Sequence, residues 1–200
     1  MKCDYMLKKE WVYREILYQL QNKNNFFSQK NLATICSTSI GNVNKAIKPF
    51  VYMNAIDKKH FGFRVIDPRK MLFYWASNRK LEKDIVYQTF VDMSVRAIEK
   101  MMPSCLFTAY SGYKFMFNTT PADYAEVFAY MTHETLEKTI ERFPKIHEKP
   151  NLIILNMDDH LTRFKKIPLA QLFVDLWNIN TWYAREFLNE LEGVLNGILE

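Results

Sequence analysis

The sequence is poor in the residues from which many enzyme sites and extracellular folds are built. Three cysteines, Cys3, Cys36 and Cys105, are odd in number and widely spaced, which excludes a disulfide framework and a CxxC metal knuckle. Only five glycines occur in 200 residues, so few turns can cradle a phosphate group. The motifs GxxxxGKS/T, GxGxxG, HExxH and GxSxG are all missing. We therefore expect no enzyme activity, no catalytic residues, no metal site and no cofactor.

Long apolar runs are also missing. No stretch approaches the roughly 18 to 20 consecutive apolar residues that a membrane-spanning helix needs, and residues 1–4 lack the apolar core of a signal peptide. We expect a cytoplasmic protein with reduced cysteines and no membrane partner. The overall balance, 48% hydrophobic and 24% charged, is that of a globular protein of one or two domains.

Positive charge is in excess, and it is concentrated in one part of the chain. Residues 1–83 hold 16 Lys and Arg against 6 Asp and Glu, a net charge of +10, whereas residues 84–200 hold 11 against 16, a net charge of −5. Clustered Lys and Arg favour polyanion binding because phosphate neutralisation releases counterions. The asymmetry indicates a polyanion-binding module joined to an acidic one, although two ordinary solvated surfaces of different charge also fit it.

Three helices are predicted at the start of the chain. Apolar residues recur at steps of three and four between residues 4 and 21, which predicts an amphipathic helix. Ser28 is a suitable N-cap for a short second helix, which the small polar residues 36–39 end. A third helix follows at once, with apolar residues at core spacing and a polar, acid-free opposite face. This pattern is typical of a helix-turn-helix, whose second helix lies in the major groove of DNA.

A basic β-hairpin is predicted directly after these helices. Residues 55–66 form two short β-prone runs around a basic tip and Gly62, as expected of the wing in a winged helix-turn-helix domain. Ser and Thr can donate to phosphate, Asn can pair with adenine, and Lys can reach guanine or phosphate. The residues that we expect to bind double-stranded DNA are Ser37, Thr38, Ser39, Asn42, Asn44, Lys45 and Lys48 around the recognition helix, and Lys58, Lys59, His60 and Arg64 in the wing. A winged helix used only for protein contacts is the alternative, and the charge of +10 argues against it.

Two further features complete the N-terminal domain, which we place at residues 1–80. Pro49 lacks the N–H that would bond to the Lys45 carbonyl, so we expect the recognition helix to kink or restart there. Asp67 and Pro68 are a helix-start signal for one more short helix. Residues 78–83 are then expected to form a linker.

Strands and helices alternate in the remainder, residues 84–200. Strands are predicted at 85–90, 105–108, 126–131 and 151–156, and helices at 94–101, 110–117, 132–143, 168–177 and 182–199. The chain is therefore expected to have an α+β fold. The winged helix-turn-helix domain is followed by an acidic α/β domain that has a small sheet, with mixed strand directions allowed, and two terminal helices. We expect this second domain to serve regulation, oligomerisation or partner binding.

Two other functions remain open for the acidic domain. In the first, Asp158, Asp159 and Glu126 support a metal-dependent nuclease or nucleotidyl-handling enzyme that the winged helix delivers to DNA. The cluster Asp158-Asp159-His160 follows a strand, however, where such residues are more often an exposed turn. In the second, the aromatic-rich domain binds a small ligand that shifts DNA affinity, as in a one-component sensor.

Several short motifs resemble one family of regulators. These are residues 39–43, which open the recognition helix, residues 67–76 after the wing, and residues 107–113 and 127–130 in the acidic domain. The segment 168–176, Pro-Leu-Ala-Gln-Leu-Phe-Val-Asp-Leu, is similar to the "SP-x-Q-x-Y-x-DL" segment of the same family, and residues 184–188 continue the similarity. The family is that of the archaeal and bacterial winged-helix regulators related to AbiEi-type antitoxins of type IV toxin-antitoxin systems.

The resemblance implies a DNA-binding transcriptional regulator. In that family the N-terminal domain binds operator DNA and represses transcription, and the C-terminal domain contributes to cooperative binding or to toxin control. It implies a repressor that binds as a homodimer or cooperative oligomer, and, more narrowly, an antitoxin with a cognate toxin as partner. The Gly-Arg-Gly-Glu-Glu-Ala run that is common after the DL motif is replaced here by residues 177–186.

Overall fold

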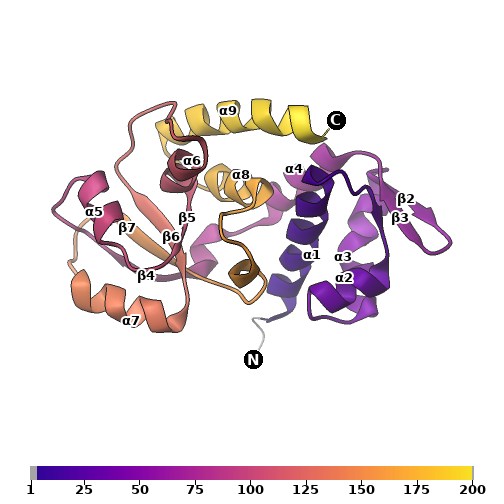
Figure 1. The fold of residues 1–200 in the computed structure, drawn as a ribbon, viewed down its shortest axis with the longest axis horizontal. Helices are drawn as coiled ribbons and strands as arrows, with labels where there is room; N and C mark the ends of the chain where they lie inside the picture. Colours follow the sequence, from indigo (N-terminus) through magenta and orange to yellow (C-terminus); the bar gives the residue numbers. More distant parts are fainter. Residues whose placement is uncertain (1–3, 200) are drawn as a thin grey trace. The chain divides into compact units, whose positions relative to one another are not determined.

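The protein has an α+β fold, as expected from the sequence. The computed structural model describes residues 4–199, with the side chains of residues 8–197, and Cys3 lies outside the described residues. The described chain forms two compact units (Figure 1). The first unit runs to Asn78 and also includes the stretch from Gly193 onward, and the second unit is Arg79–Glu192.

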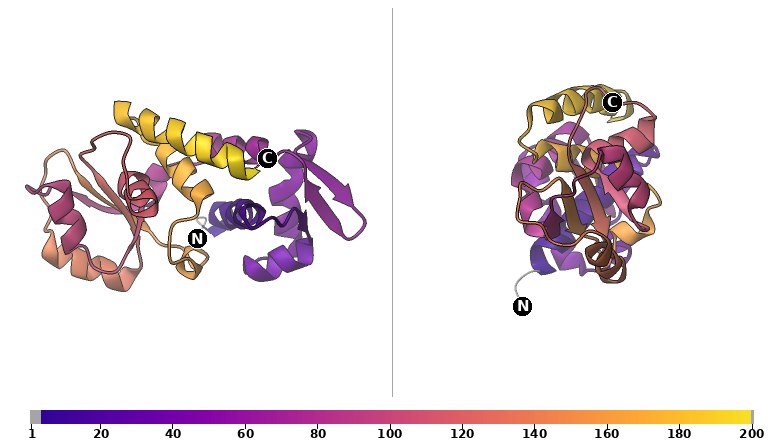
Figure 2. Two further views of the ribbon diagram at one scale, coloured as in Figure 1. Left: turned by 45° about the horizontal axis from the view of Figure 1, so that its top comes forward. Right: turned by 90° about the vertical axis from the view of Figure 1, so that its left-hand side faces the viewer.

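The first unit contains helices and a small antiparallel sheet. Its elements are α1 (Asp4–Gln21), β1 (Phe26–Phe27), α2 (Gln29–Ile35), α3 (Ile40–Tyr52), β2 (Ile56–Lys59), β3 (Gly62–Val65) and α4 (Pro68–Asn78). The strand order is β1-β3-β2, so β3 is central. Strands β2 and β3 form a hairpin that extends beyond the helices of this unit (Figure 2). Helices therefore occur at each of the four N-terminal positions that the sequence predicts.

An aromatic core joins α1, α3 and α4. The Tyr13 ring lies edge-on to the Phe50 ring at 5.0 Å between centroids, and Phe50 meets Tyr74 in the same way at 5.3 Å. Trp75 is 1% exposed, and its indole Nε1 donates to Glu10 Oε2 at 3.1 Å. Burial raises the pKa of the Tyr13 hydroxyl far above its ordinary value. This core fixes the inner side of α3 and leaves the outer side exposed.

Two local features differ from the expectation. Helix α3 continues through Pro49 to Tyr52 without a restart. The missing N–H removes one hydrogen bond near the C-terminal end of the helix, and the fully buried Phe50 ring holds the last turn in place. Strand β1 has no predicted counterpart, because a two-residue strand is too short to show a periodicity.

The second unit has a four-stranded mixed sheet. Its elements are η1 (Leu81–Asp84), β4 (Ile85–Thr89), α5 (Val95–Met101), β5 (Leu106–Thr108), α6 (Ala109–Phe117), β6 (Val127–Met131), α7 (His133–Arg142), β7 (Leu152–Asn156), η2 (Leu161–Arg163), α8 (Leu169–Trp177) and the first part of α9 (Trp182–Leu199). The strand order is β4-β7-β6-β5, in which only the central β6–β7 pair is parallel.

Helices cover both faces of this sheet (Figure 1). One face packs on α5 and α7 through a core that includes Ile98, Ala129 and Ile154. The opposite face carries Tyr130, whose hydroxyl donates to Asp175 on α8 at 2.8 Å. Strand β6 is buried along its whole length, and a strand that is buried on both faces gives a continuous apolar run rather than an alternating one.

Helix α6 begins directly at the end of β5. Ala109, the first residue of the helix, has a φ of 50°, which is in the left-handed region. A Cβ on Gly112 would lie 2.9 Å from the Phe107 carbonyl oxygen and 3.1 Å from Leu172 Cδ1. Glycine at this position therefore permits a close approach of α6 to β5 and α8.

Except for Asn78, which ends α4 in the first unit, the predicted linker at residues 78–83 is part of the second unit in the structure. Arg79 is 6% exposed and forms an ion pair with Asp84 at 2.8 Å. Leu81, in the short helix η1, is also buried. The expectation of a free linker was wrong because a polar, charged run was taken as solvated, whereas its arginine and leucine are anchored in a core.

Candidate nucleic-acid interface

Helices α2 and α3 are connected by a tight, capped turn. The Ser28 hydroxyl caps α2, and the Ser39 hydroxyl caps α3 by accepting from the Asn42 backbone N–H at 3.1 Å. Within the turn, Cys36 is fully buried and Ser37 has a left-handed φ of 45°. The turn therefore holds α3 at a fixed angle to α2.

Helix α3 has one buried and one exposed face. The buried residues are Val43, Ala46, Ile47 and Phe50. The exposed residues recur at steps of three and four, which places them along one stripe of the helix. They are Ile40, Gly41, Asn44, Lys45, Lys48 and Tyr52. This stripe contains donors, acceptors and two positive charges, and it contains no carboxylate.

Some of the predicted DNA-binding residues of the turn form hydrogen bonds within the protein. Asn42 Nδ2 donates to Thr38 Oγ1 at 3.1 Å, and both residues are half-buried. The Ser39 hydroxyl accepts the cap hydrogen bond described above, and Ser37 is exposed. Asn44, Lys45 and Lys48 are exposed on the outer side of α3, so they are the better candidates for contacts with bases or phosphates.

All four predicted wing residues are exposed. Lys58 and Lys59 end strand β2, and Lys59 Nζ forms an ion pair with Asp57 at 2.5 Å. His60 forms the two-residue turn with Phe61, whose ring is 81% exposed and lies 4.3 Å from the imidazole ring. Arg64 lies on the central strand, paired with Phe26 and Asp57. The hairpin thus presents an exposed aromatic ring among basic side chains.

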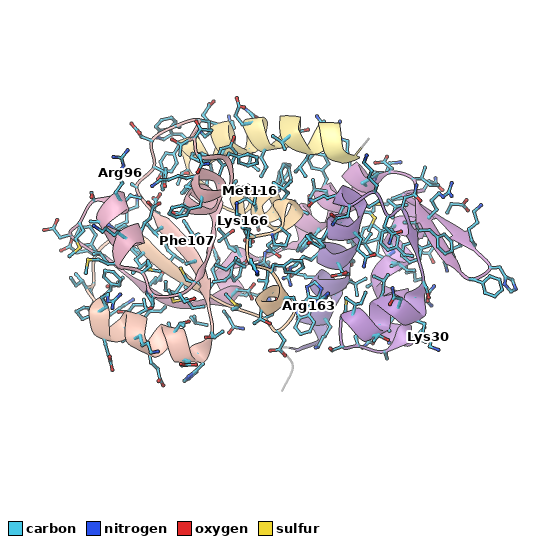
Figure 3. All side chains as sticks on the ribbon, viewed as in Figure 1. Lys30, Arg96, Phe107, Met116, Arg163 and Lys166 are labelled. Atoms are coloured by element: carbon cyan, nitrogen blue, oxygen red, sulfur yellow. The ribbon has the colours of Figure 1, made fainter. Side chains whose placement is uncertain are left out.

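Three residues of this surface were missed by the sequence analysis. Lys30 on α2 (labelled in Figure 3) lines a shallow hollow together with Ser37, Thr38 and Ser39. Tyr52 is 73% exposed at the end of α3, with Lys48 Nζ 5.8 Å from its ring centre, and Phe61 is the hairpin tip. A large aromatic residue next to the predicted basic tip of the hairpin is itself a signal of exposure, because neither side of a tight turn faces a core.

The charge pattern makes this surface attractive to a polyanion. No acidic residue occurs between Glu15 and Asp57, a segment that includes α2 and α3 entirely. The same segment contains Lys23, Lys30, Lys45 and Lys48, of which the first is in the turn after α1. A surface of one charge sign steers a phosphate backbone toward it and loses this effect at high salt.

Two of the three carboxylates of the predicted alternative enzyme site, Asp158 and Glu126, have partners within the second unit, whereas Asp159 is exposed. Asp158 Oδ1 accepts from the Leu161 backbone N–H at 2.8 Å at the start of η2, and His160 is buried against the Phe164 ring. Glu126 accepts a hydrogen bond from the Tyr183 hydroxyl, whose pKa is raised first by burial and then by this contact. In the part of the chain that the structure describes, no three His, Cys, Asp or Glu side chains come together to hold a metal ion.

A buried polar network is the main feature of the second unit that the sequence analysis missed. Asp175 is fully buried, and its Oδ1 accepts from Arg79 Nε at 3.1 Å and from Gln171 Nε2 at 2.8 Å. Its Oδ2 accepts from Thr108 Oγ1 at 2.7 Å and from the Tyr130 hydroxyl at 2.8 Å. Each member is buried, so the network connects Arg79 with β5, β6 and α8 internally and offers no surface to a substrate.

Comparison with known proteins identifies no family for this chain. No protein-family model, no curated protein and no solved structure matches this chain. Among the described residues, no helix is long and apolar enough to cross a membrane. The resemblance to AbiEi-type regulators stays a prediction, and the argument for function rests on the geometry of the first unit.

Proposed function

We propose that the first unit is a winged helix that binds double-stranded DNA, and that the protein is a DNA-binding transcriptional regulator. The observation that carries this proposal is the exposed, acid-free stripe of α3 next to a capped turn. A helix with this outer face is suited to the major groove, where Asn pairs with adenine and Lys reaches guanine or phosphate. The basic β2–β3 hairpin is suited to the neighbouring phosphate backbone.

In the proposed interface, some residues read bases and others position the DNA backbone. Asn44, Lys45 and Lys48 read bases or hold phosphates from α3, while Lys58 and Arg64 hold the backbone from the wing. A single module of this kind buries about 600 to 1,000 Å² of protein surface on DNA. Binding as a homodimer or cooperative oligomer would add the affinity that one module lacks, and native mass spectrometry on and off DNA tests this part.

The direct test is the affinity for labelled duplex from the upstream region of the protein's own gene, compared with a scrambled duplex across a salt series. We expect a preference for the native duplex, which Asn44→Ala combined with Lys48→Ala removes. Lys149→Ala is the matched control, because it deletes one exposed lysine of the second unit. Each lost phosphate contact lowers the salt slope by about 1.

The outcomes separate three possibilities. Equal and steeply salt-dependent binding to both duplexes would show that the surface binds DNA electrostatically and without sequence specificity. Absence of binding at low salt would contradict the proposal, as would an equal effect of the α3 variants and the control. A repressing role, and the narrower antitoxin role that the resemblance implies, rest on specific binding. Their tests are reporter repression by the full chain and co-purification with the product of the adjacent gene.

A further inference from the structure

The second unit contains a cavity of about 170 Å³ beside β5 and α6. Three segments form it, and each contributes one residue that is labelled in Figure 3. Phe107 comes from β5, Met116 from α6 and Lys166 from the segment that precedes α8, and the three lie close together. All lining residues belong to the second unit, so the cavity is independent of the proposed DNA interface.

Most of the residues that line the cavity are apolar, and Phe115 among them is 45% exposed. The rings of Phe107 and Phe115 lie 4.8 Å apart between centroids, and Met116 and the buried Ile167 add flexible and branched surface. An apolar cavity of about 150 Å³ is sufficient to bind benzene. The cavity therefore has the size and the lining for one aromatic ring or a branched alkyl group.

The outer part of the cavity is positively charged. Lys165 and Lys166 both line it, and both are exposed. Within the described part of the chain, neither lysine forms an ion pair. Two adjacent ammonium groups beside an apolar space complement an anion that carries an apolar body.

The wall that faces the two lysines is held rigidly. Helix α6 starts at the left-handed Ala109 and approaches β5 closely at Gly112, which itself lines the cavity. The close approach leaves no room for α6 to move toward the strand. The cavity is therefore preformed, so that a ligand would not have to open it.

We propose that this cavity binds a small carboxylate with an aromatic or branched apolar body. The apolar body lies against Phe107, Phe115 and Met116, and the carboxylate lies at Lys165 and Lys166. The site gives the second unit a binding function of its own, whatever the first unit binds.

The test compares two probes of similar size on the full chain by isothermal titration calorimetry. Benzoate carries the carboxylate, and benzyl alcohol is its uncharged counterpart. We expect benzoate to bind about tenfold more tightly, the effect of one charge-assisted hydrogen bond. Lys165→Met combined with Lys166→Met should reduce benzoate to the affinity of benzyl alcohol and leave benzyl alcohol unchanged. Lys149→Met, at an exposed lysine outside the cavity, should change neither.

The position of binding is tested separately. Cys105 also lines the cavity, and Cys105→Phe should fill it and abolish the binding of both probes. In the unmodified chain, benzoate should shift the methyl resonance of Met116, which Met116→Leu assigns, so the test does not depend on the folding of the filled variant. Equal affinity for the two probes, no binding of benzoate, or an unmoved Met116 resonance would each overturn the proposal.

Discussion

The two units place their polar side chains differently. In the first unit Asn44, Lys48 and Arg64 are exposed on α3 and the wing, while two charged side chains of α1, Arg14 and Glu15, are buried. In the second unit Arg79 and Asp175 are buried, and hydrogen bonds connect them to further buried groups. Exposed polar groups are available to a ligand, whereas buried and paired ones stabilise a fold. The exposed side of α3 is therefore the surface that we propose for DNA, and the Arg79–Asp175 network stabilises the second unit from within.

The sharpest way to break this comparison is Asp175→Ala. The variant leaves the buried donors of Arg79, Gln171 and Thr108 without their acceptor, so the free energy of unfolding of the second unit should fall by about 3 to 5 kcal/mol. Urea denaturation, followed by a probe in the second unit, measures the change. The duplex affinity of the folded protein should stay as it is.

A double variant provides the control for Asp175→Ala. Arg79→Met combined with Asp175→Leu removes both charges of this pair and should recover part of the lost stability, because neither is left buried without the other, while Asp84, the second partner of Arg79, is partly exposed to solvent. If Asp175→Ala lowers the free energy of unfolding by less than about 1 kcal/mol, the network contributes little to stability, and the contrast between the two units is contradicted.

A smaller effect is expected for Gly62→Ala in the first unit. A Cβ at this position would overlap the backbone carbonyl of Phe27, so strand β1 must move away from β3. We expect a loss of about 1 to 3 kcal/mol in the free energy of unfolding, together with weaker duplex binding because the wing shifts. Gly193→Ala is the matched control. Its Cβ meets no atom within 4 Å inside α9, and it should stabilise the chain by about 0.5 to 1 kcal/mol. Similar changes in the two variants would contradict the proposed role of Gly62.

Ser37→Gly sharpens the comparison because it separates two properties of one residue, its left-handed backbone conformation and the contact that its hydroxyl is proposed to make with DNA. The left-handed backbone of Ser37 suits glycine, so the variant should gain about 0.5 to 1 kcal/mol in the free energy of unfolding. Its duplex affinity should fall several-fold through the loss of one hydroxyl contact. Asn54→Gly, at another left-handed position, should gain less because Asn tolerates this conformation. A Ser37→Gly protein that binds duplex as tightly as the parent would remove Ser37 from the interface.

The smallest expected effect concerns the pH dependence of the second unit. Burial raises the pKa of the Cys105 thiol to about 12. The folded state therefore keeps the proton while the unfolded chain loses it near about pH 9, so stability is lost as pH rises above that value. As the pH rises from about 8 to 9.5, the parent should lose stability relative to Cys105→Ser, which has no thiol to ionise. We expect this relative loss in the free energy of unfolding to stay below about 1 kcal/mol. A difference that does not vary with pH would contradict the burial of this thiol.

Local chemistry made most elements predictable. Ser28, Ser39 and Ser94 stand immediately before helices, and each hydroxyl accepts from a backbone N–H in the first turn. The cap at Ser28 was predicted, whereas Ser39 was predicted as a contact to DNA. The apolar runs at 126–131 and 151–156 predicted the two central strands, which the structure places at 127–131 and 152–156. These signals are local, and a single sequence displays them directly.

Long-range polar pairing was not predictable from the sequence. Arg79 lies in a charged stretch that reads as a linker, and its partner Asp175 is far away in the chain. The apolar cavity was also missed, because it forms only when β5, α6 and residues 165–167 meet. For the candidate interface, the sequence predicted the exposed lysines but not that Asn42 binds Thr38, since that contact depends on the backbone of the turn.

The pairing of β4 with β7 has a consequence for how the protein assembles. Ile85 pairs with Leu155, so the sheet of the second unit cannot close until the chain as far as Leu155 has left the ribosome, whereas the β2–β3 hairpin joins near neighbours. Contacts between distant residues slow folding because the intervening chain must first be brought together. The wing and the turn before α3 can therefore form while the second unit is still an open chain.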